Sequence, residues 1–231
     1  MQVHTTKWII TALRLEGDLV IEKYNLKETK TIWTLAIFEW ERVWEEDEKE
    51  NIVLLVCWEG KTQSAFATTY LCENYSLDKI VNIWIVWNLN PEILSIWDVM
   101  IPNTFVMHDF YMPEEIDFHK AQREPIFLEY AIGEEYDLSK FTLHLSWICA
   151  TGDQFIDNTD LQSEISEKYW ADIVDMEAYS ILSVLRNYGL LDKAVVIKSV
   201  SDSADSDAKE NSMDNLNLAM ENAVNILDFT L

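Results

Sequence analysis

The chain has 231 residues, of which 49% are hydrophobic, and its 41 acidic and 17 basic side chains give a net charge of −24. This length fits one α/β domain covering residues 1–231, and the hydrophobic content argues against disorder. The negative charge repels phosphate backbones, so we expect no nucleic-acid partner. No apolar run is long enough to span a bilayer, and the N-terminus lacks a signal-peptide pattern. We therefore expect a cytoplasmic protein that does not contact membranes.

Cysteine and histidine residues are few and widely spaced. The three cysteines, Cys57, Cys72 and Cys149, form no Cys-x-x-Cys pair, and the four histidines are equally scattered. Such spacing supports neither a disulfide framework nor a zinc site. We therefore expect a protein without a metal and without a cofactor.

Apolar runs bounded by polar turns recur along the chain and predict strands. They cover residues 8–12, 32–38, 52–57, 80–83, 99–101, 142–150 and 195–200. Several runs are continuous rather than alternating, which is typical of strands covered on both faces. The acidic stretch 45–50 lies between two of these runs and indicates a hairpin tip.

Helical patterns separate the predicted strands. Apolar residues recur at helical spacing over residues 61–75, 176–188 and 212–227, and Gly189 follows the second of these segments as a C-cap. Strands that alternate with helices predict an α/β three-layer sandwich with a central mixed, mainly parallel sheet.

Polar residues follow several of the predicted strands. Ligands of such sheets bind beyond the carboxyl ends of the strands, so these residues are candidates for a functional site. They are Glu16 after the first run, Gly60-Lys61 after the third, Gly152-Asp153 after the sixth, Ser201-Asp202 after the seventh, and Asp175-Met176-Glu177 at the start of a helix.

In order and spacing, these segments resemble the nucleoside phosphorylase superfamily, and within it the 5′-methylthioadenosine/S-adenosylhomocysteine nucleosidases. Residues 12–16 are similar to the turn that ends in the family's catalytic Glu. Residues 151–156 resemble Ser-Gly-Asp-x-Phe-Ile, residues 174–178 resemble Val-Glu-Met-Glu-Ala, and residues 198–205 resemble Arg-x-Ile-Ser-Asp-x-Ala-Asp. The similarity runs from about residue 7 to the C-terminal helix and implies a nucleoside phosphorylase-like fold.

The resemblance implies hydrolysis of the N-glycosidic bond of 5′-methylthioadenosine, S-adenosylhomocysteine or a related 5′-modified adenosine, with release of adenine. This reaction needs a general acid for the departing purine and a general base for the attacking water. By resemblance, Asp202 donates a proton to purine N7, Ser201 orients Asp202, and Glu16 activates the water.

The resemblance also implies the substrate-binding residues. Glu177 grips the ribose hydroxyls and Met176 packs on the sugar, while Phe155 stacks on the adenine and the Ile156 main chain reads its edge. Asp175 and Lys198 complete the set. Lys198 replaces the family's Arg, which keeps the charge but loses the bidentate fork. The family forms homodimers in which an apolar residue of the neighbouring subunit closes the 5′ pocket; Phe105, Phe110 and Tyr111 are the candidates here.

Each of these residues also has an ordinary structural explanation. An Asp after a strand usually caps a helix, and Glu16 and Glu177 could simply favour the first turn of a helix. Met176 and Phe155 could be core residues. The joint match in order and spacing favours the catalytic interpretation.

Two other functions remain open from the sequence. Phosphorylases of the superfamily carry a Gly-Asp-Pro type turn and arginines that clamp phosphate. This chain has only four Arg, and Glu16 occupies the corresponding turn, which suits water better than phosphate. Arg14 lies nearby, so a phosphorylase stays an alternative. A catalytically inactive nucleoside-binding protein is the alternative from a different class.

Tryptophan is abundant and glycine is scarce. The chain has 10 Trp and 5 Gly, whereas average usage predicts roughly 16 Gly. Trp58, Trp84 and Trp87 occupy positions of the family's glycine loops, and Trp8, Trp40, Trp97 and Trp147 also align with family glycines. Seven such exchanges would overpack strands and fill the ribose pocket. A divergent protein with an aromatic-rich site is one explanation.

A decoding difference explains both anomalies together. Some bacteria read the codon UGA as glycine and others read it as tryptophan. A gene from a glycine-reading organism, translated by the tryptophan rule, loses Gly and gains Trp at the same positions. We therefore expect UGA codons at Trp58, Trp84, Trp87 and Trp97.

Overall fold

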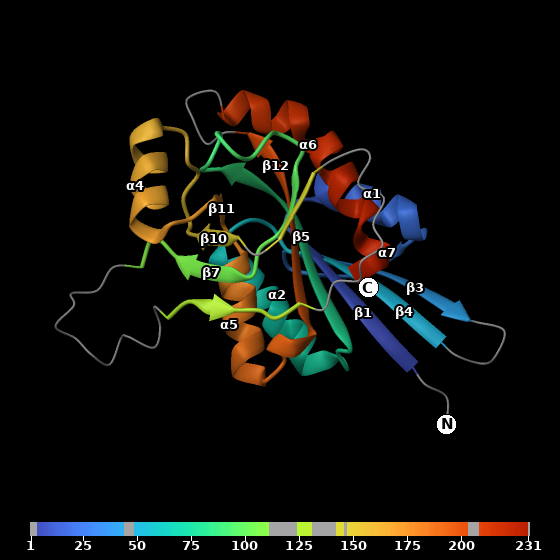
Figure 1. Cartoon of the computed structure of the whole chain (residues 1–231). Helices are drawn as coiled ribbons and strands as arrows, with labels where there is room; N and C mark the ends of the chain where they lie inside the picture. The colour runs from blue at the N-terminus through green and yellow to red at the C-terminus, as the bar shows by residue number, and fades with distance from the viewer. Residues whose placement is uncertain are drawn as a thin grey trace.

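A twelve-stranded mixed sheet forms the centre of the protein (Figure 1). The computed structural model describes residues 4–43, 49–110, 124–130, 142–145, 147–202 and 208–230. The strands are β1 His4–Thr11, β2 Lys27–Ile32, β3 Leu35–Val43, β4 Lys49–Val56, β5 Lys79–Asn88, β6 Val99–Ile101, β7 Thr104–Met107, β8 Ile126–Phe127, β9 Leu143–Leu145, β10 Ile148–Thr151, β11 Ile173–Asp175 and β12 Ala194–Asp202. The α-helices are α1 Arg14–Tyr24, α2 Lys61–Asn74, α4 Thr159–Tyr169, α5 Ala178–Tyr188, α6 Ala208–Asn225 and α7 Leu227–Thr230, with a short 3-10 helix at Leu191–Lys193.

The sheet combines parallel and antiparallel pairings, as the sequence predicted. Its main path runs β2-β3-β4-β1-β5-β11-β10-β7-β8, while β12 pairs with β5 and β6, and β6 pairs with β9. Among the described strands, six pairings are parallel and five are antiparallel. Parallel neighbours need long crossovers, and helices α1 and α2 supply them between β1, β4 and β5.

Helices cover both faces of the sheet, which confirms the layered α/β class. Helices α2 and α5 pack together on one side, and α6 packs on β12 and β5 while also contacting α1. In Figure 1, α1, α6 and α7 lie across the sheet from α2 and α5. The predicted helix over 61–75 corresponds to α2 and that over 176–188 to α5. Gly189 caps α5 in the left-handed conformation.

Several of the continuous apolar runs correspond to strands buried on both faces, whereas the run predicted as one strand over 32–38 crosses the turn at Trp33-Thr34 between β2 and β3. Every residue of β12 is buried, as are eight of the ten residues of β5. The run over 142–150 forms two strands, β9 and β10, that pair with different neighbours. Strands β3 and β4 pair antiparallel, so the predicted hairpin is correct, although residues 44–48 of its tip lie outside the described residues.

The sequence did not predict α4, and it predicted a later start for α6. Asn158 caps the N-terminus of helix α4, and its side chain accepts a hydrogen bond from the main-chain N–H of Leu161. Helix α6 begins at Ala208, earlier than the predicted 212, and continues after a one-residue break into α7. No helix in the described ranges has the length and apolar character needed to cross a bilayer.

Candidate active site

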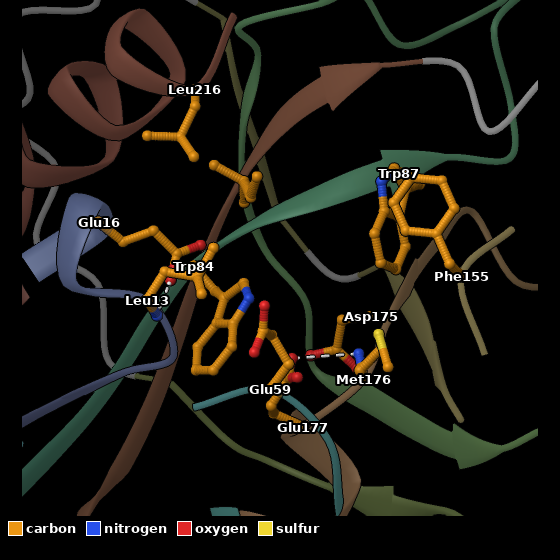
Figure 2. Close-up of a pocket in the computed structure, with 11 residues that line it drawn as sticks. Leu13, Glu16, Glu59, Trp84, Trp87, Phe155, Asp175, Met176, Glu177 and Leu216 are labelled. Carbon is orange, nitrogen blue, oxygen red and sulfur yellow. Dashed lines mark hydrogen bonds between the residues drawn. The ribbon is translucent and has the colours of Figure 1, made fainter. Parts of the chain in front are cut away.

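A pocket of about 430 Å³ lies at the ends of several strands. This volume is in the range of pockets that hold small molecules. Its walls combine acidic and apolar side chains: Leu13, Glu16, Glu59, Trp84, Ile85, Trp87, Phe155, Asp175, Met176, Glu177 and Leu216 (Figure 2). Five of the residues predicted from the sequence, Glu16, Phe155, Asp175, Met176 and Glu177, therefore meet here, although they come from three separate segments of the chain.

Glu16 is a fully buried acid in the first turn of α1. Its Oε2 accepts hydrogen bonds from the main-chain N–H groups of Leu13 (2.8 Å) and Ala12 (3.2 Å). Its Oε1 is buried without a well-formed hydrogen bond to any described residue, although the Ile85 N–H lies close enough to lower the pKa. Burial outweighs these contacts and raises the pKa of Glu16 to about 7. Glu16 can therefore exchange a proton near neutral pH.

Glu177 is a second fully buried acid, at the start of α5. Its Oε1 accepts a hydrogen bond from the Gly60 N–H (2.7 Å), and its Oε2 accepts one from the Met176 N–H (3.1 Å). Burial and then the charge of Asp175 raise the pKa of Glu177 well above its usual range, while Lys198 and the Gly60 N–H oppose them. The side chain is held firmly by main-chain groups.

Asp175 and Lys198 form a fully buried ion pair, with Nζ and Oδ2 2.7 Å apart. The contact neutralises both charges, although its angle is not that of a good hydrogen bond. Burial acts to lower the pKa of Lys198, but the surrounding acidic groups, with Asp175 first among them, together outweigh it and raise the pKa. Asp175 also accepts hydrogen bonds from the Thr151 hydroxyl (2.6 Å) and the Ala178 N–H (3.0 Å). It therefore joins β10, α5 and β12.

Ser201 and Asp202 lie at the end of β12 and are fully buried. The Ser201 hydroxyl donates a hydrogen bond to Asp202 Oδ2 at 2.8 Å, and Asn215 in α6 donates one to the Ser201 carbonyl at 3.0 Å. Asp202 is not part of the pocket wall. Its register partner on β5 is Trp87, which does line the pocket.

Phe155 and Trp87 form an aromatic wall. Their ring centroids are 4.7 Å apart in an edge-to-face arrangement, visible in Figure 2. Phe155 is 39% exposed, so part of its ring is free to contact a ligand. The Ile156 side chain points elsewhere and packs in a small core cluster with Leu89 and Val174.

The three predicted glycine-loop positions differ in their surroundings. Trp84 and Trp87 line the pocket, and the Lys198 ammonium lies 5.3 Å from the Trp84 ring centroid. Trp87 Nε1 is buried without a hydrogen-bond partner in the described residues. Trp58 is 56% exposed and is not in the pocket wall.

Several pocket residues were not singled out from the sequence. Glu59, Leu13 and Leu216 contribute to the wall, and Thr151 positions Asp175. Glu59 follows β4 beside the noted pair Gly60-Lys61, so its place after a strand was the available signal. Leu216 is on α6, and only the packing of that helix on β12 brings it near. Within the described ranges, no three His, Cys, Asp or Glu side chains are grouped as metal ligands.

Comparison with known proteins agrees with the fold. The sequence model of the Phosphorylase superfamily matches residues 8–231. A 5′-methylthioadenosine/S-adenosylhomocysteine nucleosidase from Tolumonas auensis is 25% identical over 224 residues, covering 93% of this chain and 94% of the relative. One from Buchnera aphidicola of Schizaphis graminum is 27% identical over 225 residues, covering 91% and 89%.

A solved structure is similar over nearly the whole chain. The Streptococcus pneumoniae MTA/SAH nucleosidase in complex with 8-aminoadenine superposes with a TM-score of 0.82 at 20% identity. The match covers 98% of this chain and 100% of the other. At this identity, the likeness establishes the fold.

Proposed function

Because the chain belongs to the Phosphorylase superfamily, we propose that it is a purine nucleosidase. It hydrolyses the N-glycosidic bond of 5′-methylthioadenosine, S-adenosylhomocysteine or a related 5′-modified adenosine and releases adenine. The names of the full-length relatives support this substrate class. The observation that carries the proposal is Glu16, a buried acid that faces a pocket of suitable size and whose pKa is about 7.

The site residues divide the reaction between them. Glu16 takes a proton from water as the water oxygen bonds to the anomeric carbon. The glycosidic C–N bond breaks, and its electrons move into the purine, which Asp202 protonates at N7. The Ser201 hydroxyl holds the Asp202 carboxyl in place at 2.8 Å. Proton transfer by positioned side chains contributes typically about 10²–10⁴-fold to such rates.

The substrate is bound by the remaining pocket residues. Glu177 accepts hydrogen bonds from the ribose hydroxyls, Met176 packs on the sugar, and Phe155 stacks on adenine beside the Ile156 main chain. Lys198 and Asp175 hold the floor of the pocket through their buried ion pair. Every titratable residue of the described pocket wall is acidic, which favours a neutral nucleoside over an anion.

The same charge distribution favours hydrolysis over phosphorolysis. Arg14, the arginine nearest the proposed base in sequence, ion-pairs with Asp18 at 2.6 Å and lies 4.4 Å from the centre of the Phe38 ring. It is not in the pocket wall. Phosphate binding needs cationic or main-chain donors, and acidic walls oppose it.

We propose that the active protein is a cytoplasmic homodimer, as in the family it resembles. Cys57, Cys72 and Cys149 are all free thiols, which fits a reducing compartment. Of the aromatic residues that could reach a partner's pocket, Phe105 is fully buried in its own subunit. Phe110 is only partly buried and is the remaining candidate within the described residues, since Tyr111 lies outside them. A monomer by light scattering would contradict the dimer.

Adenine release tests the activity directly. Purified protein is incubated with 5′-methylthioadenosine or S-adenosylhomocysteine, with and without phosphate, and free adenine is measured. We expect release that does not depend on phosphate. Strict dependence on phosphate would assign a phosphorylase, and tight nucleoside binding without adenine release would assign a binding protein.

Asp202→Asn tests the proposed acid. We expect turnover to fall by about 10²–10⁴-fold with little change in the melting temperature. Asp192→Asn, at an exposed acid before the same strand, is the matched control and should retain activity. Full activity of Asp202→Asn would remove Asp202 from the mechanism.

A further inference from the structure

Positive φ angles outside glycine are concentrated at tryptophan. In the part of the chain that the structure describes, five non-glycine residues have positive φ: Asn25, Trp33 (φ 56°), Trp58 (69°), Trp97 (76°) and Trp170 (52°). Asparagine tolerates the left-handed region because its short amide bonds locally. Large side chains avoid this region because Cβ approaches the neighbouring carbonyl oxygen. Four tryptophans in this conformation therefore need an explanation.

Packing does not compensate at three of these positions. Trp33 is 92% exposed, Trp170 is 81% exposed and Trp58 is 56% exposed, so their rings lie largely in solvent. A buried ring could justify backbone strain through its contacts, but an exposed ring cannot. At these three positions the strain has no visible benefit in the folded chain, whereas the indole N–H of Trp97, which is 43% exposed, donates a hydrogen bond to Asn215 Oδ1 at 3.2 Å.

Two of these tryptophans stand at a helix C-cap and at a hairpin turn, which are positions that glycine usually occupies. Trp170 is the C-cap of α4, in the left-handed conformation that Gly189 adopts at the end of α5. Trp33 is the first of the two residues between β2 and β3, a tight hairpin turn in which glycine is favoured. Neither tryptophan is among the seven that align with family glycines, so these observations are independent of the resemblance to the family.

We infer that Trp33, Trp58, Trp97 and Trp170 are glycine in the protein that the source cell makes, because its UGA codons specify glycine. A decoding rule acts on every UGA codon alike, so it extends to Trp84 and Trp87. With glycine at both positions, two indole rings leave the pocket wall and the space beside Glu16 and Phe155 widens. The inference does not rest on the proposed activity.

The gene and the native protein test this inference. We expect UGA at the four codons and peptides from source cells with the mass of glycine at each position. A UGG codon, or a peptide with the mass of tryptophan, would overturn it. Recombinant protein offers a second measurement, because the chain with glycine at these four positions should melt at a higher temperature than the chain with tryptophan.

A separate set of contacts joins three loops behind Glu177. The Lys61 N–H donates to Asp153 Oδ1 (2.7 Å), and the Asp153 N–H donates to Asp109 Oδ2 (2.8 Å). The Lys61 ammonium closes the ring with bonds to both oxygens of Asp109, at 2.6 and 2.7 Å. These residues follow β4, β7 and β10, so the ring ties together the ends of three strands.

The ring fixes the main-chain donor of Glu177. Gly60 precedes Lys61 and donates its N–H to Glu177 Oε1 at 2.7 Å, with a φ of 96° that favours glycine. The side chains of Lys61 and Asp109 are only 21% and 23% exposed, so solvent screens their attraction less than at an open surface. Burial opposes ionisation of Asp109, but the bonds from Lys61 and Asp153 outweigh it and lower its pKa.

We propose that Asp109 is a positioning residue that acts through Lys61 and Gly60 on Glu177. This inference rests on the proposed function, in which Glu177 accepts hydrogen bonds from the ribose hydroxyls. When the ring is broken, the Gly60 N–H moves and Glu177 no longer meets those hydroxyls at the right distance. The loss is then specific to the part of the substrate that Glu177 binds.

Two substrates separate positioning from general damage to the fold. Asp109→Asn should lower kcat/KM for 5′-methylthioadenosine about tenfold or more, and lower it much less for the 2′-deoxy analogue, which lacks a hydroxyl for Glu177. Equal losses on both substrates would overturn the proposal, as would no loss on either. Asp157→Asn, an exposed acid outside the ring, is the matched control.

A conservative variant keeps the test informative if Asp109→Asn folds poorly. Asp109→Glu retains the negative charge and should preserve the ratio of the two kcat/KM values better than Asp109→Asn. Failure of the unmodified protein to hydrolyse either nucleoside would count against the proposed function. A ratio that every Asp109 variant leaves unchanged would count against the positioning role alone.

Discussion

Glu16 is an acid of the pocket wall whose surroundings disfavour its charged form. Its carboxyl group is fully buried, yet only one oxygen has well-formed hydrogen bonds in the described structure. Burial disfavours the charged form, which explains a pKa of about 7. A base with this pKa is partly ionised near neutral pH and still binds a proton readily, which suits activation of water.

The raised pKa predicts a pH-dependent stability. Folding favours the protonated form of Glu16. The contribution of Glu16 to the free energy of unfolding is therefore fully present below a pH of about 4.5 and is lost as the pH rises through about 7. The change that Glu16→Gln causes in the free energy of unfolding should therefore be more stabilising at pH 8 than at pH 4, by on the order of 3 kcal/mol. Denaturant unfolding at both pH values measures this difference, with exposed Glu22→Gln as the control. Equal effects of the two variants would contradict the assigned pKa.

Trp33 offers a direct test of backbone strain at one residue. Its ring is 92% exposed and its φ is 56°, so glycine removes strain without removing packing. We expect Trp33→Gly to raise the free energy of unfolding by about 0.5–1 kcal/mol, since the relief of strain exceeds the added entropy of the unfolded chain. Leu15→Gly, at an exposed position inside α1, should instead lower it by about 1 kcal/mol.

At the scale of elements, β12 organises the site because it is buried along its whole length. It carries Lys198 in its interior and Ser201 and Asp202 at its end. Pairing with β5 places Lys198 beside Trp84 and Asp202 beside Trp87, and these two tryptophans line the pocket. The ion pair from Lys198 to Asp175 then fixes where β11 ends and α5 begins.

Removing one partner of this ion pair should destabilise the protein strongly. Lys198→Met leaves Asp175 charged and buried without its cation, which costs about 3–5 kcal/mol. Lys23→Met is the control, because its pair with Asp228 has similar length (2.8 Å) but side chains 25% and 58% exposed. That variant should change the free energy of unfolding by less than about 1 kcal/mol. Similar losses from both variants in denaturant unfolding would refute the difference between buried and exposed pairs.

For the whole molecule, the net charge of −24 is the dominant electrostatic property. Like charges repel across the surface and oppose the compact state, and salt screens this repulsion. Raising the ionic strength from roughly 10 mM to about 150 mM shortens the screening length from about 30 to about 8 Å. We expect the melting temperature to rise by about 2–4 °C, equivalent to about 1 kcal/mol. A fall in melting temperature over this range would show that attractive pairs dominate instead.

The sequence by itself determined the alternation of strands and helices and the segments that carry polar groups. These features depend on local properties: apolar runs, turn residues, and acids placed directly after strands. Burial and pairing, in contrast, depend on residues far apart in the chain, so only the tertiary structure decided them. It paired Asp175 with Lys198, raised the pKa of Glu16 by burial, and placed Asp202 behind the pocket wall rather than in it. The left-handed backbone of Trp33 and Trp170 likewise emerged only from the turns that the packed strands and helices require.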